Sequence, residues 1–189
     1  MILEKITENN LQYAVKIQEE LFPEISARAN YEESVAGVSG YEYFLVYEGG
    51  ACVGVTGLYS LPEDPDSAWL GWFGIREGHR RKHLGSAVLK KFEEMAAAKG
   101  YRFVRLYTDA VDNDAAIAFY KANGYTCEPY ENAEDPACRK IRLLIFSKPL
   151  ASEELVELVP WNSRNIHFTE QVAKQEKYNT HPEKEERKL

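Results

Sequence analysis

The sequence of 189 residues has little of what small proteins use to build metal or disulfide centres. Its three cysteines, at 52, 127 and 138, show no CxxC spacing, and of its four histidines only His79 and His83 lie close together. A structural zinc site needs about four ligands at short spacings, so we predict no metal site. Reduced thiols in the cytoplasm are the plain expectation.

Long apolar runs and an excess of basic charge are also missing. No run approaches the roughly 18 apolar residues of a spanning helix, and MILEKITENN lacks the apolar core of a signal peptide, so we expect a cytoplasmic protein without a membrane partner. With 23 basic and 30 acidic side chains the net charge is −7. This argues against nucleic acid as a partner, because counterion release needs a basic surface, and mildly favours a cationic or neutral substrate.

What is present is the composition of an ordinary globular domain. Hydrophobic residues make up 44% and charged residues 28% of the chain, close to the average of soluble domains. After Leu150 the character changes to a short helical run that Pro160 ends, followed by a polar segment that cannot bury much surface by itself. We therefore expect one domain over 1–150 and a C-terminal extension over 151–189.

The extension has three apolar residues in an otherwise polar segment, Trp161, Ile166 and Phe168. They could anchor it on the domain or across a homodimer, and both options stay open.

Apolar periodicity predicts an α/β fold with the order βααβββαβαββ. From 69 to 130 strands and helices alternate, which favours a mixed sheet with helices on both faces over separate domains. Thr7 is the expected N-cap of the first helix and Pro23 its end, and LPEDPDS is expected to be a turn or loop. The predicted strands cover 2–6, 43–48, 51–61, 67–75, 102–108, 126–130 and 139–150; the predicted helices cover 8–22, 28–38, 84–99 and 113–123.

The most informative segment is IREGHRRKHLGSAVL, residues 75–89, in which a β-run passes through a basic turn into an amphipathic helix. The first turn of a helix has unpaired N–H groups and the positive end of the helix dipole. Arg80, Arg81 and Lys82 add charge, and Gly85 lets the backbone approach an anion closely. The segment favours a phosphate or pyrophosphate site; the alternative is a solvated basic loop before a core helix. The GxGxxG and Walker patterns are absent.

The run Phe73–Ser86 resembles the acetyl-CoA signature [Q/R]-x-x-G-x-[G/A] of the GNAT superfamily of N-acyltransferases, with Arg80 first and Gly85 last. His83 occupies the position of the family's first glycine, and histidine tolerates the left-handed region better than bulky residues do. The resemblance implies that the CoA pyrophosphate is held by the backbone amides of Arg81, Lys82, His83, Leu84, Gly85 and Ser86.

A second block, Asn113–Tyr125, resembles the family's N-x-x-A-x-x-[FL]-Y-x-x-x-G-[FY] helix. Asn113 and Tyr120 are seven residues apart, which places both on one helix face about 10 Å from each other. We expect Asn113 to belong to the cofactor-binding residues, because one end of this face could hold the pantetheine arm while the other reaches the thioester. Taken separately, Asn113 would be interpreted as a helix N-cap, and Tyr120 as an ordinary tyrosine of the core. Together with the basic loop, the two blocks make a family match over roughly 42–147.

The resemblance implies direct transfer of an acetyl group from acetyl-CoA to an amine of a small molecule or a peptide. The sheet would splay between 69–75 and 102–108, and the backbone of Phe73 and Ile75 would bind the pantetheine arm like an added strand. Tyr120 would be the general acid, since a tyrosine with a reference pKa of about 10 can donate to a thiolate of similar basicity.

The general base has no clear candidate, because 69–73 contains no carboxylate where many relatives carry one. A water chain or a residue from elsewhere must serve; the candidates are Asp109, Asp112, Glu20, Glu24 and His79. No covalent acyl-enzyme is implied, since no cysteine has a histidine at an activating spacing.

Two other functions stay open: a catalytically weak GNAT-fold module that binds acyl-CoA or a partner, and a nucleotide binder of another fold. In the family's layout, substrate choice lies in 22–42, 59–68 and 128–138, and the sequence does not choose between a small amine, an amino acid, an antibiotic and a protein N-terminus. Aromatic residues that could contact an amine through cation–π interactions are Tyr41, Tyr59, Trp69, Trp72 and Tyr130.

Overall fold

The computed structural model of the chain describes residues 1–23, 25–111, 113–130 and 142–150. The predicted C-terminal extension, with Trp161, Ile166 and Phe168, lies outside the described residues, as do Glu24 and Asp112. None of the helices in these described ranges is both long and apolar enough to cross a membrane.

The described elements follow the predicted order βααβββαβαββ, which confirms the α/β fold class. They are β1 (Ile2–Lys5), α1 (Leu11–Leu21), α2 (Arg28–Val35), β2 (Tyr41–Glu48), β3 (Ala51–Leu61), β4 (Asp64–Ile75), the 3₁₀ turn η1 (Glu77–His79), α3 (Leu84–Ala98), β5 (Phe103–Asp109), α4 (Asp114–Ala122), β6 (Thr126–Pro129) and β7 (Leu143–Pro149).

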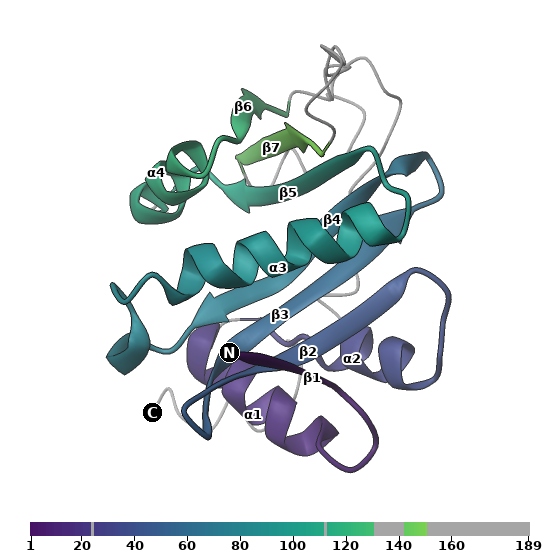
Figure 1. Cartoon of the computed structure of the whole chain (residues 1–189), viewed down its shortest axis with the longest axis vertical. Helices are drawn as coiled ribbons and strands as arrows, with labels where there is room; N and C mark the ends of the chain where they lie inside the picture. The colour runs from purple at the N-terminus through teal and green to yellow at the C-terminus, as the bar shows by residue number, and fades with distance from the viewer. Residues whose placement is uncertain (24, 112, 131–141, 151–189) are drawn as a thin grey trace, which may run out of the picture.

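The strands form one mixed sheet in the order β1-β2-β3-β4-β5-β7-β6. In the described part of the chain only β4 and β5 pair in parallel, from Ser67 opposite Phe103 to Trp69 opposite Arg105. Beyond these positions the two strands separate toward their carboxyl ends (Figure 1). We call this arrangement the fork: its closed end is the paired segment, and its open end consists of Leu70–Ile75 and Leu106–Asp109.

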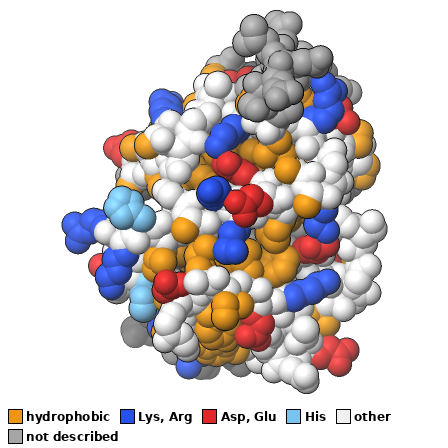
Figure 2. Space-filling model, viewed as in Figure 1, with side chains coloured by type: hydrophobic (Ala, Val, Ile, Leu, Met, Phe, Trp, Pro, Cys, Tyr) orange, Lys and Arg blue, Asp and Glu red, His pale blue; other side chains and the backbone are white. Residues whose placement is uncertain are grey.

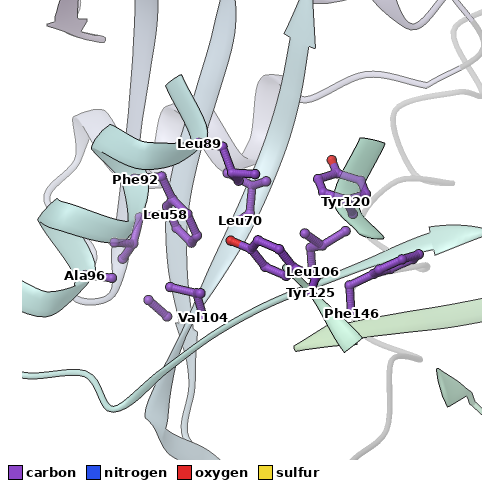
Figure 3. Packing of buried hydrophobic residues seen from close by; sticks show 11 residues of the cluster. Leu58, Leu70, Leu89, Phe92, Ala96, Val104, Leu106, Tyr120, Tyr125 and Phe146 are labelled. Carbon is purple, nitrogen blue, oxygen red and sulfur yellow. The ribbon is translucent and has the colours of Figure 1, made fainter. Parts of the chain in front are cut away.

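Helices cover both faces of the sheet because side chains alternate along each strand. On one face, α3 packs on Leu58, Leu70 and Leu106 through Leu89 and Phe92 (Figure 3). On the other face, α1 and α2 pack on β2 and β3 around Ala14, Val15, Tyr31, Tyr43 and Leu45. The fork therefore lies between two helical layers.

A buried polar network fastens the closed end of the fork. Arg105, only 1% exposed, pairs through Nε with Oδ2 of the fully buried Asp64 at 3.2 Å. The same Nε donates to Ser67 Oγ at 3.1 Å, and Nη1 donates to Ser147 Oγ at 2.6 Å. Trp69 Nε1 donates to Asp64 Oδ2 at 3.2 Å. One guanidinium thus links β4, β5 and β7 where the parallel pairing begins.

Two local predictions were wrong. α1 starts at Leu11, with Asn10 rather than Thr7 in the N-cap position, because Asn10 Oδ1 accepts the Thr7 backbone N–H at 2.7 Å and ends the turn there. β4 starts at Asp64, so the predicted loop LPEDPDS shrinks to a turn at 62–63. The polar Asp64 signals a loop in sequence, yet its partner Arg105 lets it enter the sheet.

Candidate active site

A cavity of about 680 Å³ opens where the two strands of the fork separate. Its walls come from the end of α1, the end of β4, the loop and first turn of α3, and one face of α4. Clefts at the carboxyl ends of strands are where open α/β sheets bind ligands, and the size lies in the ordinary range for ligand pockets.

The cavity brings together most of the predicted catalytic and cofactor-binding residues, while the aromatic candidates Tyr41, Tyr59, Trp69, Trp72 and Tyr130 are not among its lining residues. Lining it, along with Tyr120, are Phe73, Ile75, Arg80, Arg81, His83, Gly85, Ser86 and Asn113. Lys82 and Leu84 are not among the lining residues: Lys82 Nζ donates to the Gly78 carbonyl at 3.0 Å, and Leu84 packs against the cluster of Ile75 and Val88. Their part in cofactor binding, like that of the lining residues, stays a prediction.

The start of α3, which lines the cavity through Gly85 and Ser86, has backbone donors that precede the hydrogen-bond ladder of the helix. The first intrahelical hydrogen bond runs from Ala87 N to His83 O at 3.1 Å, so the N–H groups of Leu84, Gly85 and Ser86 precede the ladder. His83 is the N-cap, with φ 59° and ψ 7°. It adopts the left-handed conformation that a glycine would take most easily, which agrees with the tolerance expected for histidine.

Positive charge gathers at the same end of the cavity. Arg80 Nε donates to the Ile75 carbonyl at 2.8 Å, which ties this side chain to the end of β4. Figure 2 shows Lys, Arg and His side chains along the edge where η1 and the start of α3 lie in Figure 1. Helix dipole and cationic side chains together favour an anionic group there.

Two aromatic rings line the cavity beside the first turn of α3. Phe73 of β4 and Phe119 of α4 lie with ring centroids 6.0 Å apart. A Cβ added at Gly85 would meet Phe119 Cε2 at 3.3 Å. The absence of a side chain at Gly85 therefore lets the ring and the helix backbone lie close together.

Tyr120 reaches the cavity from α4 and is 8% exposed. Its ring packs on Phe146 and Tyr125 at centroid distances of 5.3 and 6.0 Å. In Figure 3 its hydroxyl points away from Leu106 and Phe146. Burial raises the pKa of Tyr120 above its ordinary value, so the phenol stays neutral and keeps its proton at physiological pH.

Asn113 occupies the N-cap position of α4 without making the side-chain bond of a cap. Its Nδ2 instead donates to the Val111 carbonyl at 3.1 Å, and the residue lines the cavity. The simple capping interpretation of Asn113 therefore does not account for its side chain.

The base candidates do not come together with Tyr120. Glu20 pairs with Arg76 at 2.9 Å, and Asp109 Oδ1 accepts the Val111 N–H at 2.9 Å. His79 sits on η1 and is not a lining residue. Among the described residues that line the cavity there is no Asp or Glu, so these contacts assign no side chain as the base.

Sequence reasoning missed several lining residues: Leu21, Phe22, Gly74, Ala115, Ala116 and Phe119. Three of these stand in the Asn113–Tyr125 block, where small residues at the start of the helix leave room for a ligand. Phe22 lies at the edge of the 22–42 segment expected to govern substrate choice but was not singled out, and Leu21 gave no signal, because apolar residues at the end of an amphipathic helix are typical of the core.

Residues 8–125 match the family model of the Acetyltransferase (GNAT) family. This chain belongs to that family. No curated protein matches the sequence closely enough to count as a relative. The GNAT assignment thus rests on more than half of the chain.

Solved structures share the GNAT fold at low identity. A protein from Desulfovibrio desulfuricans assigned to the GNAT family is 16% identical, with 79% of this chain and 99% of that chain covered and a TM-score of 0.67. The ribosomal-protein-S18-alanine N-acetyltransferase of Escherichia coli is 17% identical, with 84% and 99% covered and a TM-score of 0.63. The PaiA N-acetyltransferase of Thermoplasma acidophilum, solved with coenzyme A, is 16% identical, with 79% and 99% covered and a TM-score of 0.60.

Proposed function

We propose that this protein is an N-acetyltransferase that moves an acetyl group from acetyl-CoA directly to a primary amine. The observation that carries the proposal is the cavity in the open end of the fork. It joins the cationic start of α3 to the buried phenol of Tyr120. The polyanionic part of the cofactor would thus bind at the start of α3, and its thioester would lie near Tyr120 in the same cavity.

The lining fits acetyl-CoA in chemical character. The N–H groups of Leu84, Gly85 and Ser86, with Arg80 and Arg81, would hold the pyrophosphate. Apolar walls such as Phe119 would enclose the arm, and the edge of β4 near Phe73 and Ile75 would bind its amides like an added strand. When bound, acetyl-CoA supplies an acetyl group activated as a thioester.

Tyr120 would hold a proton at Oη and give it to the departing sulfur, as general acid. Its place in the cavity supports this role, while burial raises its pKa and keeps the phenol protonated until a thiolate develops beside it. An acyl-cysteine has little support: burial raises the pKa of the Cys52 and Cys127 thiols, and neither lines the cavity. Thiolates are the nucleophilic form, so direct transfer is favoured.

The amine must lose a proton, since alkyl amines have a pKa of about 10.4. Because no described lining residue is a carboxylate, we propose that water bound to backbone carbonyls relays this proton. The same observation supports a second candidate, a module that binds acyl-CoA with weak or no turnover. The two differ in thiol release when an amine is present.

Titration calorimetry with acetyl-CoA tests the cofactor site. The wild-type protein should bind, and the Arg80→Ala/Arg81→Ala variant should bind roughly tenfold or more weakly, because each charge-assisted hydrogen bond contributes about 1.5–3 kcal/mol. The matched control is Lys90→Ala, which removes a positive charge from an exposed side chain of α3 that pairs with Glu94 and does not line the cavity; it should bind like wild type. Equal loss in both variants would indicate nonspecific electrostatics.

Thiol release then separates enzyme from binding module. The amine panel is a peptide with N-terminal alanine, after the Escherichia coli neighbour, together with an aminoglycoside and spermidine, which are named for two further neighbours of the same fold, an aminoglycoside 6'-N-acetyltransferase and a spermidine N-acetyltransferase chimera. Release of CoA with at least one amine supports the enzyme, while tight binding without release across the panel supports the module.

A further inference from the structure

The cavity has a wall that lies on the opposite face of the sheet from α3 and α4. Leu21 and Phe22, at the end of α1, line it beside Gly74 of β4. A Cβ added at Gly74 would come within 3.1 Å of Leu21 Cδ1 and of two ring atoms of Phe22. The two side chains are therefore packed directly on the strand, with no space between.

The backbone behind this wall is fixed by a buried glutamine. Phe22 N donates to the Gln18 carbonyl at 2.8 Å. The Gln18 side chain is fully buried; its Nε2 donates to the Ile25 carbonyl at 2.8 Å and its Oε1 accepts the Ala27 N–H at 2.9 Å. The chain after α1 is thus held to α1 itself.

Two further contacts fasten the end of α1 to the sheet. Glu20 pairs with Arg76 at 2.9 Å, and Arg76 Nη1 donates to the Cys52 carbonyl at 3.2 Å, which joins α1, β4 and β3. The Phe22 ring packs edge-on against Trp72 at 5.6 Å, and Trp72 Nε1 donates to Asn30 Oδ1 at 2.8 Å. The wall is braced from both sides.

We propose that Leu21 and Phe22 set the length of the acyl group that the cavity accepts, and this rests on the function proposed above. The cationic start of α3 fixes the polar end of the ligand, so the acyl group falls in the apolar part of the cavity. A braced apolar wall offers no polar partner and does not retract easily, because overfilling packed apolar sites is unfavourable. A short acyl group fits, and a longer chain collides with Phe22.

Calorimetry with acetyl-CoA and hexanoyl-CoA tests this by affinity alone. Wild type should bind acetyl-CoA at least about tenfold more tightly than hexanoyl-CoA. In Phe22→Ala the affinity for hexanoyl-CoA should rise at least about tenfold, because each methylene that enters apolar space contributes roughly fourfold and about two methylenes in the freed space suffice, while acetyl-CoA affinity changes little. Phe22→Leu, a milder change, should shift the ratio in the same direction and guards against misfolding of the alanine variant.

The matched control is Phe119→Ala, which truncates an aromatic residue of the same cavity beside Gly85. It should weaken both acyl-CoAs by the same factor and leave their ratio unchanged. An unchanged ratio in folded Phe22 variants, or an equal shift in the control, overturns the proposal about the wall while the proposed function stands. Absence of binding of either acyl-CoA to wild type overturns both.

Discussion

The two ends of the fork are built from the same two strands, but one end is packed and the other contains a cavity. At the closed end, β4 and β5 pair in parallel and Arg105 fills the interior with hydrogen bonds to Ser67 and Ser147 and an ion pair to Asp64. At the open end, the same strands separate and leave a cavity of about 680 Å³. At the closed end the buried polar side chains bond to one another, whereas at the open end backbone N–H groups at the start of α3 have no partner within the helix.

This difference indicates how the fold keeps a cleft open. If β4 and β5 continued to pair beyond Trp69, their hydrogen bonds would cover the edge of β4 that now lines the cavity. The buried network lies where the parallel pairing begins, and the pairing ends after Trp69 and Arg105. Stability should therefore depend mainly on the closed end, and ligand binding mainly on the open end.

The largest expected effect is at the closed end, in Arg105→Ala. Removing the arginine partner of buried Asp64 should lower the free energy of unfolding by about 3–5 kcal/mol, out of a usual total of about 5–15 kcal/mol. Urea unfolding measures it. The control is Arg102→Ala, whose ion pair with Asp66 is exposed and should contribute less than about 1 kcal/mol. Similar losses in the two variants would contradict the role of the network.

Tyr120→Phe should separate catalysis from binding at the open end. Loss of the proton donor should lower kcat by about 10²–10⁴-fold, while calorimetric affinity for acetyl-CoA stays within a few-fold of wild type. The change keeps the ring that packs on Phe146, so unfolding stability should hardly change. Activity near the wild-type level would exclude Tyr120 as the acid.

Alkaline pH should weaken both ends together. Burial raises the pKa of Tyr59 near the closed end and of Tyr120 at the open end. Below about pH 10 both states of the protein hold these protons; above it the unfolded chain loses them first, so stability falls as pH rises. Urea unfolding at pH 8 and pH 11 checks this, and Tyr120→Phe should show a smaller decrease than wild type.

The smallest effect is expected for His83→Gly. A left-handed non-glycine residue costs roughly 1–2 kcal/mol, and the freedom that glycine adds to the unfolded chain offsets about 0.4–1 kcal/mol of that relief. The melting temperature should change by only a few degrees and acetyl-CoA affinity should persist. A tenfold loss of affinity would mean that the imidazole itself contacts the ligand.

The sequence predicted the order of helices and strands, because that order depends on local patterns, and the basic turn that it singled out lines the cavity through Arg80, Arg81 and His83. Apolar periodicity places the helices, and the basic turn before Leu84 marks the start of α3 regardless of what packs around it. The spacing of Asn113 and Tyr120 likewise places both on the cavity.

What escaped prediction depends on contacts between distant segments. The sequence around Asp64 predicts a loop. In the structure Asp64 is part of a strand, because it pairs with Arg105, which lies 41 positions later in the chain. Phe22 has the sequence pattern of a core residue, and only the structure shows that it lines the cavity beside Gly74. No local pattern carries this information, because the relevant neighbours come from other strands and helices.

The most direct test of the account is a crystal structure of the protein with coenzyme A. The account predicts the pyrophosphate on the backbone amides of Leu84, Gly85 and Ser86, and the sulfur within hydrogen-bond reach of Tyr120 Oη. Coenzyme A bound outside the open end of the fork, or with its sulfur far from Tyr120, would contradict it.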